Sequence, residues 1–366
     1  MSGLPIRPNI LAMQPYSPGK PIDEVKRELG LTDVVKLASN ENPLGPSPLA
    51  VAAVKAAADM IHVYPDGSAH DLRAALASKY NLAFDQVLVG NGSDELIHLL
   101  GQVFLGKSTD EIIVGDPSFV RYDAAAGLAN CVIKKVPVTT DMELDLEAFA
   151  SATTENTKLI FIANPNNPTG TVVTHSQVVK LLKSIPSSVA VVLDEAYYEF
   201  AAHHPEFPRS IELLSEFPNV IVMRTFSKAY GLAGIRIGYA FVSPEVSDAV
   251  HRAREPFHVN SLAQIAGIAA LGDSDHLAKT VQNNQTELDR MAAAFESHGF
   301  KPVASFANFM LVDLGQPARP IFDKLLNKGI ITRSGDVLGL PTYLRVSVGT
   351  ADEISTFLNA FSEIFS

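Results

Sequence analysis

Three polar residues of different chemistry each follow a short apolar run of the kind that forms a buried strand. They are Asn167 after residues 160–163, Asp194 after residues 189–193 and Lys228 after residues 219–223. In open parallel sheets, ligands bind outside the carboxyl ends of the strands. If these three strands are parallel, an amide, a carboxylate and an amine therefore converge on one crevice.

Each of the three residues also has a purely structural interpretation. Asn167 can belong to a turn, Asp194 can cap a helix, and Lys228 can be a surface amine. Their combination favours chemistry, because a lysine amine can form a Schiff base with an aldehyde cofactor. A carboxylate that faces a pyridine nitrogen keeps that nitrogen protonated, which makes the ring an electron sink.

A phosphate group on such a cofactor needs hydrogen-bond donors. The helix N-terminus predicted at Ser93 and Asp94, the segment at Ser227, and the guanidinium of Arg236 can supply them. Residues 90–95, Gly-Asn-Gly-Ser-Asp-Glu, lack the third glycine of a dinucleotide fingerprint and favour a single phosphate.

Residues 101–108 match the P-loop pattern letter for letter. A P-loop needs a preceding strand and a following helix, so that free backbone N–H groups surround the phosphate. The apolar spacing over residues 93–105 predicts a helix instead, and the run at residues 111–114 predicts a strand after it. We therefore interpret residues 101–108 as the end of a helix.

The elements that position these residues are predicted from a series of short apolar runs. The runs cover residues 86–89, 111–114, 131–138, 158–163, 189–193, 220–223 and 235–241. Runs without polar alternation, bounded by Gly, Pro, Asn or Asp, are typical of strands that are buried on both faces. The pattern predicts an α/β protein whose large domain has a mainly parallel, seven-stranded sheet covered by helices.

The rest of the chain predicts a smaller α/β domain. Helical patterns cover residues 22–30, 49–60, 69–80, 245–298, 320–328 and 352–365, and further strands are predicted at residues 309–314 and 343–348. We expect an N-terminal arm at residues 1–15, a large domain at 49–259, and a small domain made of 16–48 and 260–366. The proline-rich start is expected to pack on the small domain or on a partner subunit.

Composition narrows the functional classes. The chain has 366 residues, with 29 Lys and Arg against 40 Asp and Glu, which gives a net charge of −11 and argues against binding to a nucleic-acid backbone. No segment has the ~18 consecutive apolar residues of a membrane span, and the start lacks an apolar signal core, so we expect a cytoplasmic protein without a membrane partner. The single cysteine, Cys131, and histidines without metal spacing predict no disulfide and no metal site.

Several motifs resemble a known enzyme family. Residues 227–239, Ser-Lys-Ala-Tyr-Gly-Leu-Ala-Gly-Ile-Arg-Ile-Gly-Tyr, resemble the lysine signature of fold-type I pyridoxal-phosphate aminotransferases, and residues 166–170 and 194–197 are similar to two other motifs of that superfamily. Residues 37–43, 64–67 and 256–264 resemble the histidinol-phosphate aminotransferase family. The resemblance extends from residue 16 to residue 350.

This resemblance implies roles at the ring of a pyridoxal 5′-phosphate cofactor. Lys228 would hold the cofactor as an internal aldimine and move a proton between the substrate Cα and the cofactor, and Asp194 would pair with the ring nitrogen. Tyr197 and Asn167 would hydrogen-bond the ring oxygen. Tyr122 would stack on the ring face.

The resemblance also implies a phosphate site that two subunits share. The backbone amides of Ser93 and Asp94 would bind the cofactor phosphate together with Ser227 and Arg236. Tyr64 would reach the phosphate from the other subunit, so we expect a homodimer.

The substrate would be held by Arg333 and Arg345, with Tyr16 closing over it and Asn40 in the same site. An arginine fork binds phosphate or carboxylate equally well, which leaves the anionic group of the substrate open. The chain departs from the family pattern after Arg333, where a Pro and a Tyr are missing, and at His258, where Asn is common. Both departures are expected near the substrate.

The resemblance implies a histidinol-phosphate:2-oxoglutarate aminotransferase of histidine biosynthesis, with ping-pong kinetics. An aromatic amino acid aminotransferase, acting on Phe or Tyr, is the main alternative. A phosphothreonine decarboxylase and a catalytically silent cofactor-binding module are two others, since the lysine motif alone does not determine which bond at Cα breaks.

Overall fold

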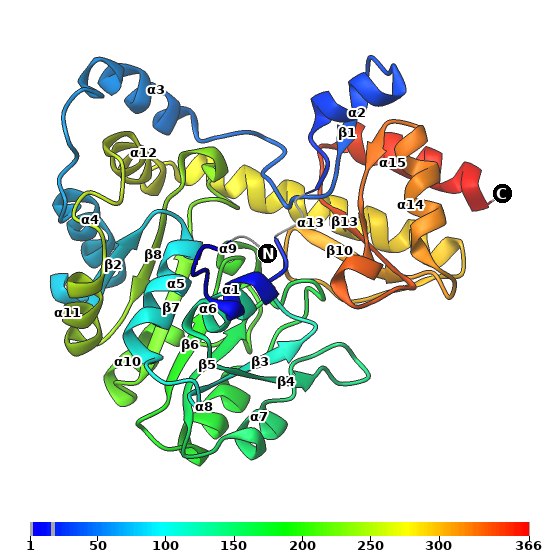
Figure 1. Ribbon diagram of the computed structural model, residues 1–366. Helices are drawn as coiled ribbons and strands as arrows, with labels where there is room; N and C mark the ends of the chain where they lie inside the picture. Colours follow the sequence, from blue (N-terminus) through cyan, green and yellow to red (C-terminus); the bar gives the residue numbers. More distant parts are fainter. Residues whose placement is uncertain (1–2, 16–18, 366) are drawn as a thin grey trace.

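The computed structural model describes residues 3–15 and 19–365, which form a large and a small unit (Figure 1). Tyr16, which we expected at the substrate, lies outside the described residues. Within them, the central sheet of the large unit has the seven strands that the apolar runs predict. In spatial order these are β2 (Val87–Gly90), β8 (Gly238–Phe241), β7 (Val220–Thr225), β6 (Ala190–Asp194), β5 (Thr157–Ala163), β3 (Glu111–Asp116) and β4 (Val132–Pro137).

The sheet is mainly parallel, as predicted. Strands β7, β6, β5, β3 and β4 run parallel to one another, whereas β8 is antiparallel to both β2 and β7. Strands β5, β6 and β7 are adjacent, so their carboxyl ends lie side by side. The three polar segments after them therefore meet at one edge of the sheet.

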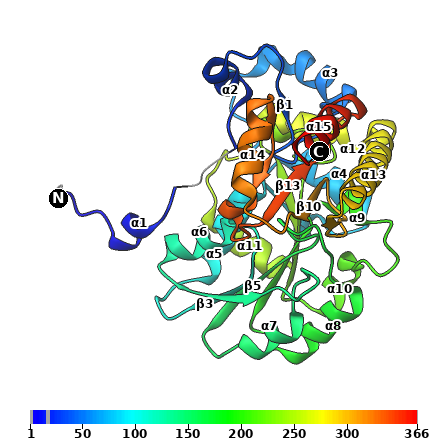
Figure 2. The same ribbon diagram turned by 90° about the vertical axis from the view of Figure 1, so that its right-hand side faces the viewer.

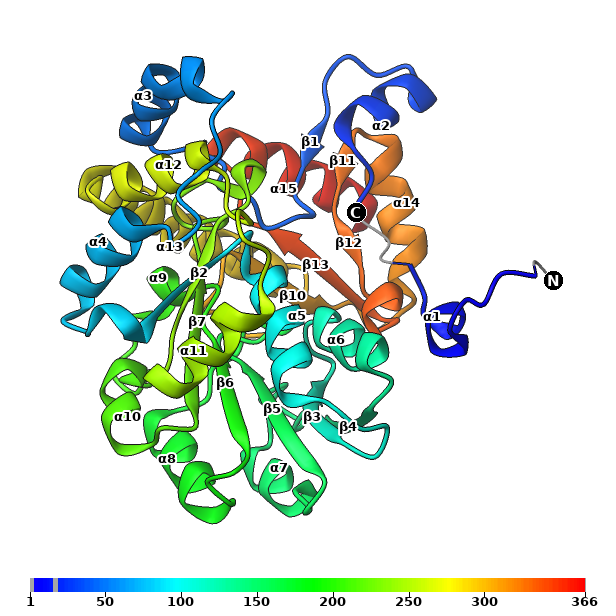
Figure 3. The same cartoon turned by 60° about the vertical axis from the view of Figure 1, so that its left-hand side comes forward.

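Helices cover both faces of this sheet, which explains why its strands lack polar alternation. One face packs against α5 (Ser93–Phe104), α6 (Arg121–Ala129) and α11 (Pro244–Ala253), as Figure 3 shows. The other packs against α3 (Pro48–Ala57), α4 (His70–Tyr80), α7 (Leu146–Ala152), α8 (His175–Ser184), α10 (Ser210–Glu216) and α12 (Ser261–Leu271). Alternate residues of each strand serve the two faces: Ile160 and Ile162 point to one, and Phe161 points to the other.

The small unit is built on a mostly antiparallel arrangement of short strands. Its larger sheet contains β12 (Arg333–Ser334), β13 (Tyr343–Ser347), β10 (Phe309–Asp313) and β9 (Lys301–Pro302), and β1 (Val35–Lys36) pairs in parallel with β11 (Ile330–Ile331). Around them lie α2 (Ile22–Leu29), α14 (Ala318–Asn327) and α15 (Ala351–Phe365) (Figure 2). Shorter helices elsewhere are α9 (Tyr198–Ala201), η1 (Ala58–Met60), η2 (Phe84–Gln86), η3 (Ala233–Ile235) and η4 (Gly335–Leu338).

The packing corrects the domain boundary that we expected at residue 260. Ala263, Ala266 and Ala270 of α12 belong to the hydrophobic cluster of the large unit. The next helix, α13 (Ser274–Ser297), carries Leu288 into the cluster of the small unit. We therefore place the boundary inside α13, which joins the two units in Figure 1. The sequence does not reveal this boundary, because the helical pattern over residues 245–298 shows no change in the spacing of its apolar residues where one unit ends and the next begins.

The N-terminal arm packs on the large unit, which was not among the expected alternatives. Helix α1 (Pro8–Ala12) contacts α6 of that unit, and a contact of the arm with a partner subunit stays a prediction. Asn9 donates to the Gly127 carbonyl oxygen at 2.8 Å, and Arg7 donates to the Leu128 carbonyl oxygen at 3.1 Å. The last carbonyl groups of a helix have no partner inside the helix, so the end of α6 is a natural acceptor for the arm. In the described ranges, no helix is both long and apolar enough to cross a bilayer.

Candidate active site

A cavity of about 1290 Å³ lies at the carboxyl ends of β5, β6 and β7, against the small unit. Most of the residues singled out in the sequence line it. These are Asn40, Ser93, Asp94, Tyr122, Asn167, Asp194, Tyr197, Ser227, Lys228, Arg236, Arg333 and Arg345. The fold thus brings together side chains that are up to 305 positions apart, from Asn40 to Arg345.

Asp194 is a buried carboxylate with one oxygen still unpartnered. Its side chain ends β6, where it is only 4% exposed. Oδ2 accepts a 2.8 Å hydrogen bond from the Tyr122 hydroxyl, but Oδ1 has no hydrogen-bond partner among the described residues. Burial raises the pKa of Asp194 to about 7, although the hydrogen bonds from Tyr122 and from the backbone N–H of Ala196 act in the opposite direction. A cationic or N–H partner at Oδ1 would relieve this cost.

The structure corrects the role expected for Tyr122. Its ring is fully buried and stacked on Phe161, with centroids 4.5 Å apart, and its hydroxyl is bonded to Asp194. Tyr122 therefore holds the Asp194 carboxylate through its hydroxyl, and its buried ring is not available to stack on a cofactor ring. Phe119, three residues earlier, is less buried, lines the same cavity and lies edge-on to Tyr122.

Lys228 sits in a loop that bends sharply after β7. The Leu232 N–H donates to the Phe226 carbonyl oxygen at 3.0 Å, and Gly231 adopts a φ of 69° against the backbone of Gly45. A side chain at position 231 would collide with the Gly45 carbonyl oxygen, so only glycine fits this turn. The loop directs Lys228 Nζ to within 3.4 Å of the Ser39 carbonyl oxygen.

The amine of Lys228 is poised to lose its proton. Burial, together with the positive charge of Arg345, lowers the pKa of Lys228 to about 8. A lysine with a pKa near the operating pH can act both as a nucleophile and as a proton carrier.

Tyr197 presents its hydroxyl to the cavity between two amides. The hydroxyl oxygen accepts from Asn40 Nδ2 at 3.0 Å and from Asn167 Nδ2 at 3.4 Å. The other end of the Asn40 amide, Oδ1, accepts a 2.7 Å hydrogen bond from Ser347. Asn40 is thus hydrogen-bonded at both ends of its amide, which favours a role in positioning Tyr197; its contact with substrate stays a prediction.

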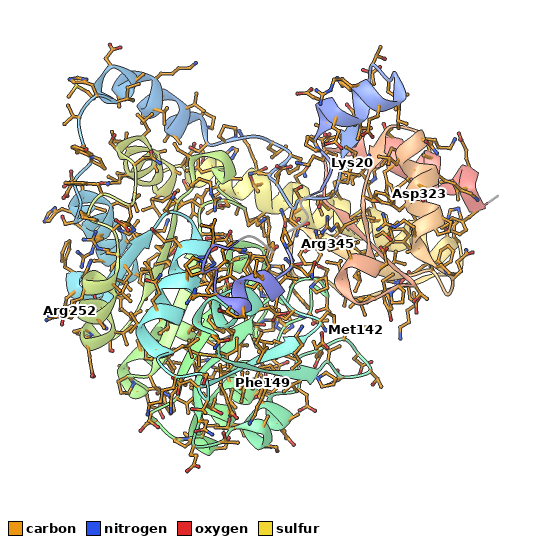
Figure 4. The ribbon with its side chains drawn as sticks, viewed as in Figure 1. Lys20, Met142, Phe149, Arg252, Asp323 and Arg345 are labelled. Atoms are coloured by element: carbon orange, nitrogen blue, oxygen red, sulfur yellow. The ribbon has the colours of Figure 1, made fainter. Side chains whose placement is uncertain are left out.

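The two arginines of the small unit line the cavity opposite the sheet. Arg345 on β13 donates from Nη1 to Asn167 Oδ1 at 2.6 Å and from Nη2 to the Ala38 carbonyl oxygen at 2.9 Å. Figure 4 shows Arg345 where the small unit meets the large one. Arg333 lies directly opposite Arg345 in the register of β12 and β13. Two positive charges therefore face the lysine across one cavity.

Arg236 and the start of α5 lie together at the other end of the cavity. Gly92, which precedes α5, has a φ of 80°, and a Cβ there would lie 2.4 Å from Arg236 Nη2. The close approach that glycine permits places the guanidinium beside the free N–H groups of the first turn of α5. The predicted strand at 235–241 is wrong in its first residues, since Arg236 adopts a φ of 64° and β8 begins at Gly238.

Other motifs lie away from the cavity or serve structure. Residues 101–108 end α5 and precede β3, so they form no P-loop. His258, expected near the substrate, is buried beside Glu95, with Nδ1 2.7 Å from Oε2, and does not line the cavity. Tyr64 is 79% exposed and stacks on Phe257, also outside the cavity of its own chain. Within residues 3–15 and 19–365, no cluster of His, Cys, Asp or Glu has the geometry to hold a metal ion.

Comparison with known proteins places this site in a family. Residues 32–361 match the family described as aminotransferase class I and II. The chain belongs to this family.

Its relatives include well-matched proteins of full length. The histidinol-phosphate aminotransferase of Moorella thermoacetica is 47% identical over 362 residues, which cover 98% of this chain and 93% of that protein. The one of Caldicellulosiruptor saccharolyticus is 44% identical over 355 residues, covering 97% and 98%. The structure of histidinol-phosphate aminotransferase from Sinorhizobium meliloti in complex with pyridoxal-5′-phosphate is 30% identical, with a TM-score of 0.91 over 99% of this chain and 97% of that one.

These matches confirm the resemblance and the fold class that the sequence motifs predicted. In this aminotransferase, sequence reasoning missed Phe119 and the backbone of Ser39 as parts of the cavity wall. A local signal could have identified Phe119, because it is a second aromatic residue three positions before Tyr122, in the segment between β3 and α6. Ser39 carries none, since its contribution is a carbonyl oxygen whose position depends on the packing of the small unit.

Proposed function

We propose that this aminotransferase binds pyridoxal 5′-phosphate at Lys228 and exchanges an amino group between glutamate and the keto form of histidinol phosphate. Glutamate becomes 2-oxoglutarate and imidazole-acetol phosphate becomes histidinol phosphate, in two half-reactions with ping-pong kinetics. The observation that carries the proposal is the buried carboxylate of Asp194, with its unpartnered oxygen, in the same cavity as the Lys228 amine.

The residues of the cavity fit this cofactor. A protonated ring nitrogen would give Asp194 Oδ1 the cationic partner that it lacks. A phosphate would find Arg236, Ser227 and the N-terminus of α5 at one end of the cavity. When bound, the cofactor supplies an aldehyde that links to an amine and a ring that withdraws electrons from the substrate Cα.

The side chains of this chain would transfer the proton and orient the cofactor ring. The amine of Lys228 would accept the proton from the substrate Cα and deliver it to the former aldehyde carbon of the cofactor. The negative charge of Asp194 would favour the protonated ring nitrogen, and the Tyr197 and Asn167 side chains would hydrogen-bond the ring oxygen. Phe119 replaces Tyr122 in our proposal as the aromatic residue that faces the ring.

Substrate binding is assigned to Arg345 and Arg333, whose guanidinium groups suit a phosphate or a carboxylate. Val337 and Leu338 of η4 lie next to them in the cavity wall. The substrate assignment is supported by relatives above 40% identity that are named histidinol-phosphate aminotransferases. Among the described residues of the cavity, none gives a reason to prefer an aromatic amino acid as the main substrate. The comparison of histidinol phosphate with phenylalanine given below tests this alternative.

We also propose that the enzyme is a homodimer with a shared phosphate site. Large apolar side chains are exposed on neighbouring elements at one side of the large unit. They are Leu44, Leu49, Met60, Ile61, Val63, Tyr64, Phe257 and Ile268. Helices α3 and α12, which carry two of them, pack against each other. A contiguous apolar patch is typical of a protein interface, and Tyr64 within it can reach the phosphate site of a second copy. The cytoplasmic location stays a prediction.

The experiment that tests the function compares kcat/KM for histidinol phosphate and for phenylalanine, with 2-oxoglutarate as acceptor. We expect histidinol phosphate to be preferred by at least about 10²-fold, because a buried guanidinium left without its phosphate loses charge-assisted hydrogen bonds. Equal or higher efficiency with phenylalanine would assign the protein to the aromatic aminotransferases. Release of carbon dioxide or phosphate without amino transfer would indicate a different reaction on the same fold.

A further inference from the structure

A buried arginine lies behind the active site and has no part in the cavity. Arg224 is 1% exposed at the end of β7, four residues before Lys228. Its Nε donates to Glu195 Oε2 at 2.8 Å, and Nη2 lies 2.7 Å from the same oxygen. Ser210 donates to the other oxygen of Glu195. The carboxylate of Glu195 is thereby held from two sides.

The same guanidinium also holds an aromatic ring. Its central carbon lies 3.3 Å from the centroid of the Tyr198 ring, within the range of a stacked cation–π contact. Glu195 directly follows Asp194 in the sequence, and Tyr198 directly follows Tyr197. One buried side chain therefore contacts the residue after each of two groups that face the cavity.

Strand alternation explains this arrangement. Val191 and Leu193 of β6 point to the cluster under α8 and α12, whereas Val192 points to the cluster under α5. By the same alternation, Asp194 and Glu195 leave the strand end on opposite faces of the sheet. The Glu195 N–H also donates to the Met223 carbonyl oxygen at 2.8 Å, which extends the pairing of β6 and β7 to this level. Arg224 thus joins the end of β6, which carries Asp194, to the end of β7, which leads into the Lys228 loop.

We propose that Arg224 is a positioning residue for the aminotransferase reaction. From the opposite face of the sheet, its contacts with Glu195 and Tyr198 set the placement of Asp194 and Tyr197 relative to Lys228. The inference deepens the proposed function and rests on it. Lysine cannot replace Arg224, because an ammonium group offers the charge without the planar fork that binds Glu195 and stacks on Tyr198 together.

The test uses the holoenzyme and the Arg224→Lys variant. We expect kcat to fall by about 10- to 100-fold, the size of effect that a misplacement of about 1 Å produces, while KM for the amino donor stays within about twofold. The pH midpoint of the visible absorbance of the bound cofactor should rise, because a displaced Tyr197 hydroxyl stabilises the deprotonated form less well. A residue that merely stabilised the fold would change the melting temperature without moving this midpoint.

Two further variants complete the test. Arg209→Lys is the matched control, because Arg209 forms an exposed ion pair with Glu212 on the same side of the molecule, and it should leave kcat and the midpoint unchanged. Tyr198→Leu removes the stacking contact with Arg224, together with an edge contact to Phe207, but leaves the ion pair of Arg224 with Glu195, and it should raise the midpoint to a smaller extent. If Arg224→Lys is recovered unfolded, Tyr198→Leu and the neutral variant Glu195→Gln are measured in its place.

The outcomes separate the two claims. Wild-type protein that forms no absorbance band with pyridoxal 5′-phosphate would contradict the proposed function itself. A wild-type band and activity, with kcat and the midpoint unchanged in every folded variant of Arg224, Glu195 and Tyr198, would overturn the inference alone. A lower kcat with an unchanged KM and a raised midpoint supports it.

Discussion

Arg345 Nη1 donates a 2.6 Å hydrogen bond to Asn167 Oδ1, although 178 positions separate the two residues. Arg345 belongs to β13 of the small unit, and Asn167 follows β5 of the large unit. The bond links a side chain assigned to the substrate with one assigned to the cofactor. The guanidinium is also held by the Ala38 carbonyl oxygen, so its direction is set before any substrate arrives.

Because of this arrangement, Arg345→Lys should weaken substrate binding much more than cofactor binding. An ammonium group cannot keep both protein contacts and bind an anion with a fork. We expect KM for histidinol phosphate to rise by about 10- to 100-fold, the loss of a charge-assisted hydrogen bond of about 1.5–3 kcal/mol. Steady-state kinetics and cofactor titration measure the two effects. Equal losses in both would indicate that Arg345 serves the fold.

Lys228→Ala should remove the visible absorbance that borohydride abolishes in the wild-type enzyme. It should also lower kcat by at least about 10²- to 10⁴-fold, since the other lysine that lines the cavity, Lys36, is ion-paired with Glu41 at 3.0 Å and is not placed to carry the proton in its stead. Lys180→Ala is the control, because the Lys180 side chain is 70% exposed and pairs with Glu147 on the surface. Wild-type turnover in Lys228→Ala would refute the assignment.

Asp194 predicts an unusual pH dependence of stability in the enzyme without cofactor. Burial raises the pKa of Asp194 from 3.8 to about 7, so the folded state binds a proton between these values that the unfolded state lacks. Folding stability attributable to Asp194 therefore falls as the pH rises through this window, and its cost reaches about 4 kcal/mol above pH 7.

Asp194→Asn should remove that cost while abolishing efficient catalysis. In urea denaturation of the cofactor-free enzyme, the variant should be more stable than the wild type at pH 8, and the difference should vanish near pH 4. Other ionisable groups are common to both proteins and cancel in the difference. A variant that is less stable at pH 8 would show that the carboxylate is already well compensated in the cofactor-free protein.

Tyr64→Ala should weaken cofactor binding without unfolding the chain, because the Tyr64 side chain is 79% exposed. We expect the cofactor dissociation constant to rise by about 10- to 100-fold, the loss of a hydrogen bond to a charged group. Cofactor-free protein, titrated with pyridoxal 5′-phosphate by absorbance, provides the measurement.

A mixture of Tyr64→Ala and Lys228→Ala chains tests whether Tyr64 acts across subunits. At limiting cofactor, exchange of subunits should restore about a quarter of wild-type activity, because half of the dimers are mixed and each contains one complete site. Activity that does not rise on mixing would place Tyr64 outside the partner's site.

Much of the site could be predicted because its chemistry follows local sequence patterns. Buried parallel strands read as apolar runs, and the residues after them must lie at the sheet edge where ligands bind. For this reason the sequence alone predicts that Asn167, Asp194 and Lys228 lie together. The motif around Lys228 also indicates the cofactor, because it resembles the lysine signature of pyridoxal-phosphate aminotransferases and because a lysine amine can form a Schiff base with an aldehyde.

The sequence was less informative wherever a side chain has a choice of partners. Tyr122 was placed on the cofactor ring, yet its hydroxyl bonds to Asp194 and its ring stacks on Phe161. The boundary at residue 260 was wrong because α12 is as apolar as a helix of either unit. The sequence predicts that the arm packs on the small domain or on a partner subunit, and it does not reveal that the carbonyl groups at the end of α6 can accept hydrogen bonds from Arg7 and Asn9.

By itself, the sequence determined the periodic elements, the acidic balance and the residues that stand at the strand ends, because each of these depends on neighbours within a few positions. Only the tertiary structure decided which distant groups meet: Arg345 with Asn167, Asn40 with Tyr197, and Arg224 with both Glu195 and Tyr198. Such contacts depend on how helices and strands distant in the sequence pack together, and on which buried polar group finds a partner there.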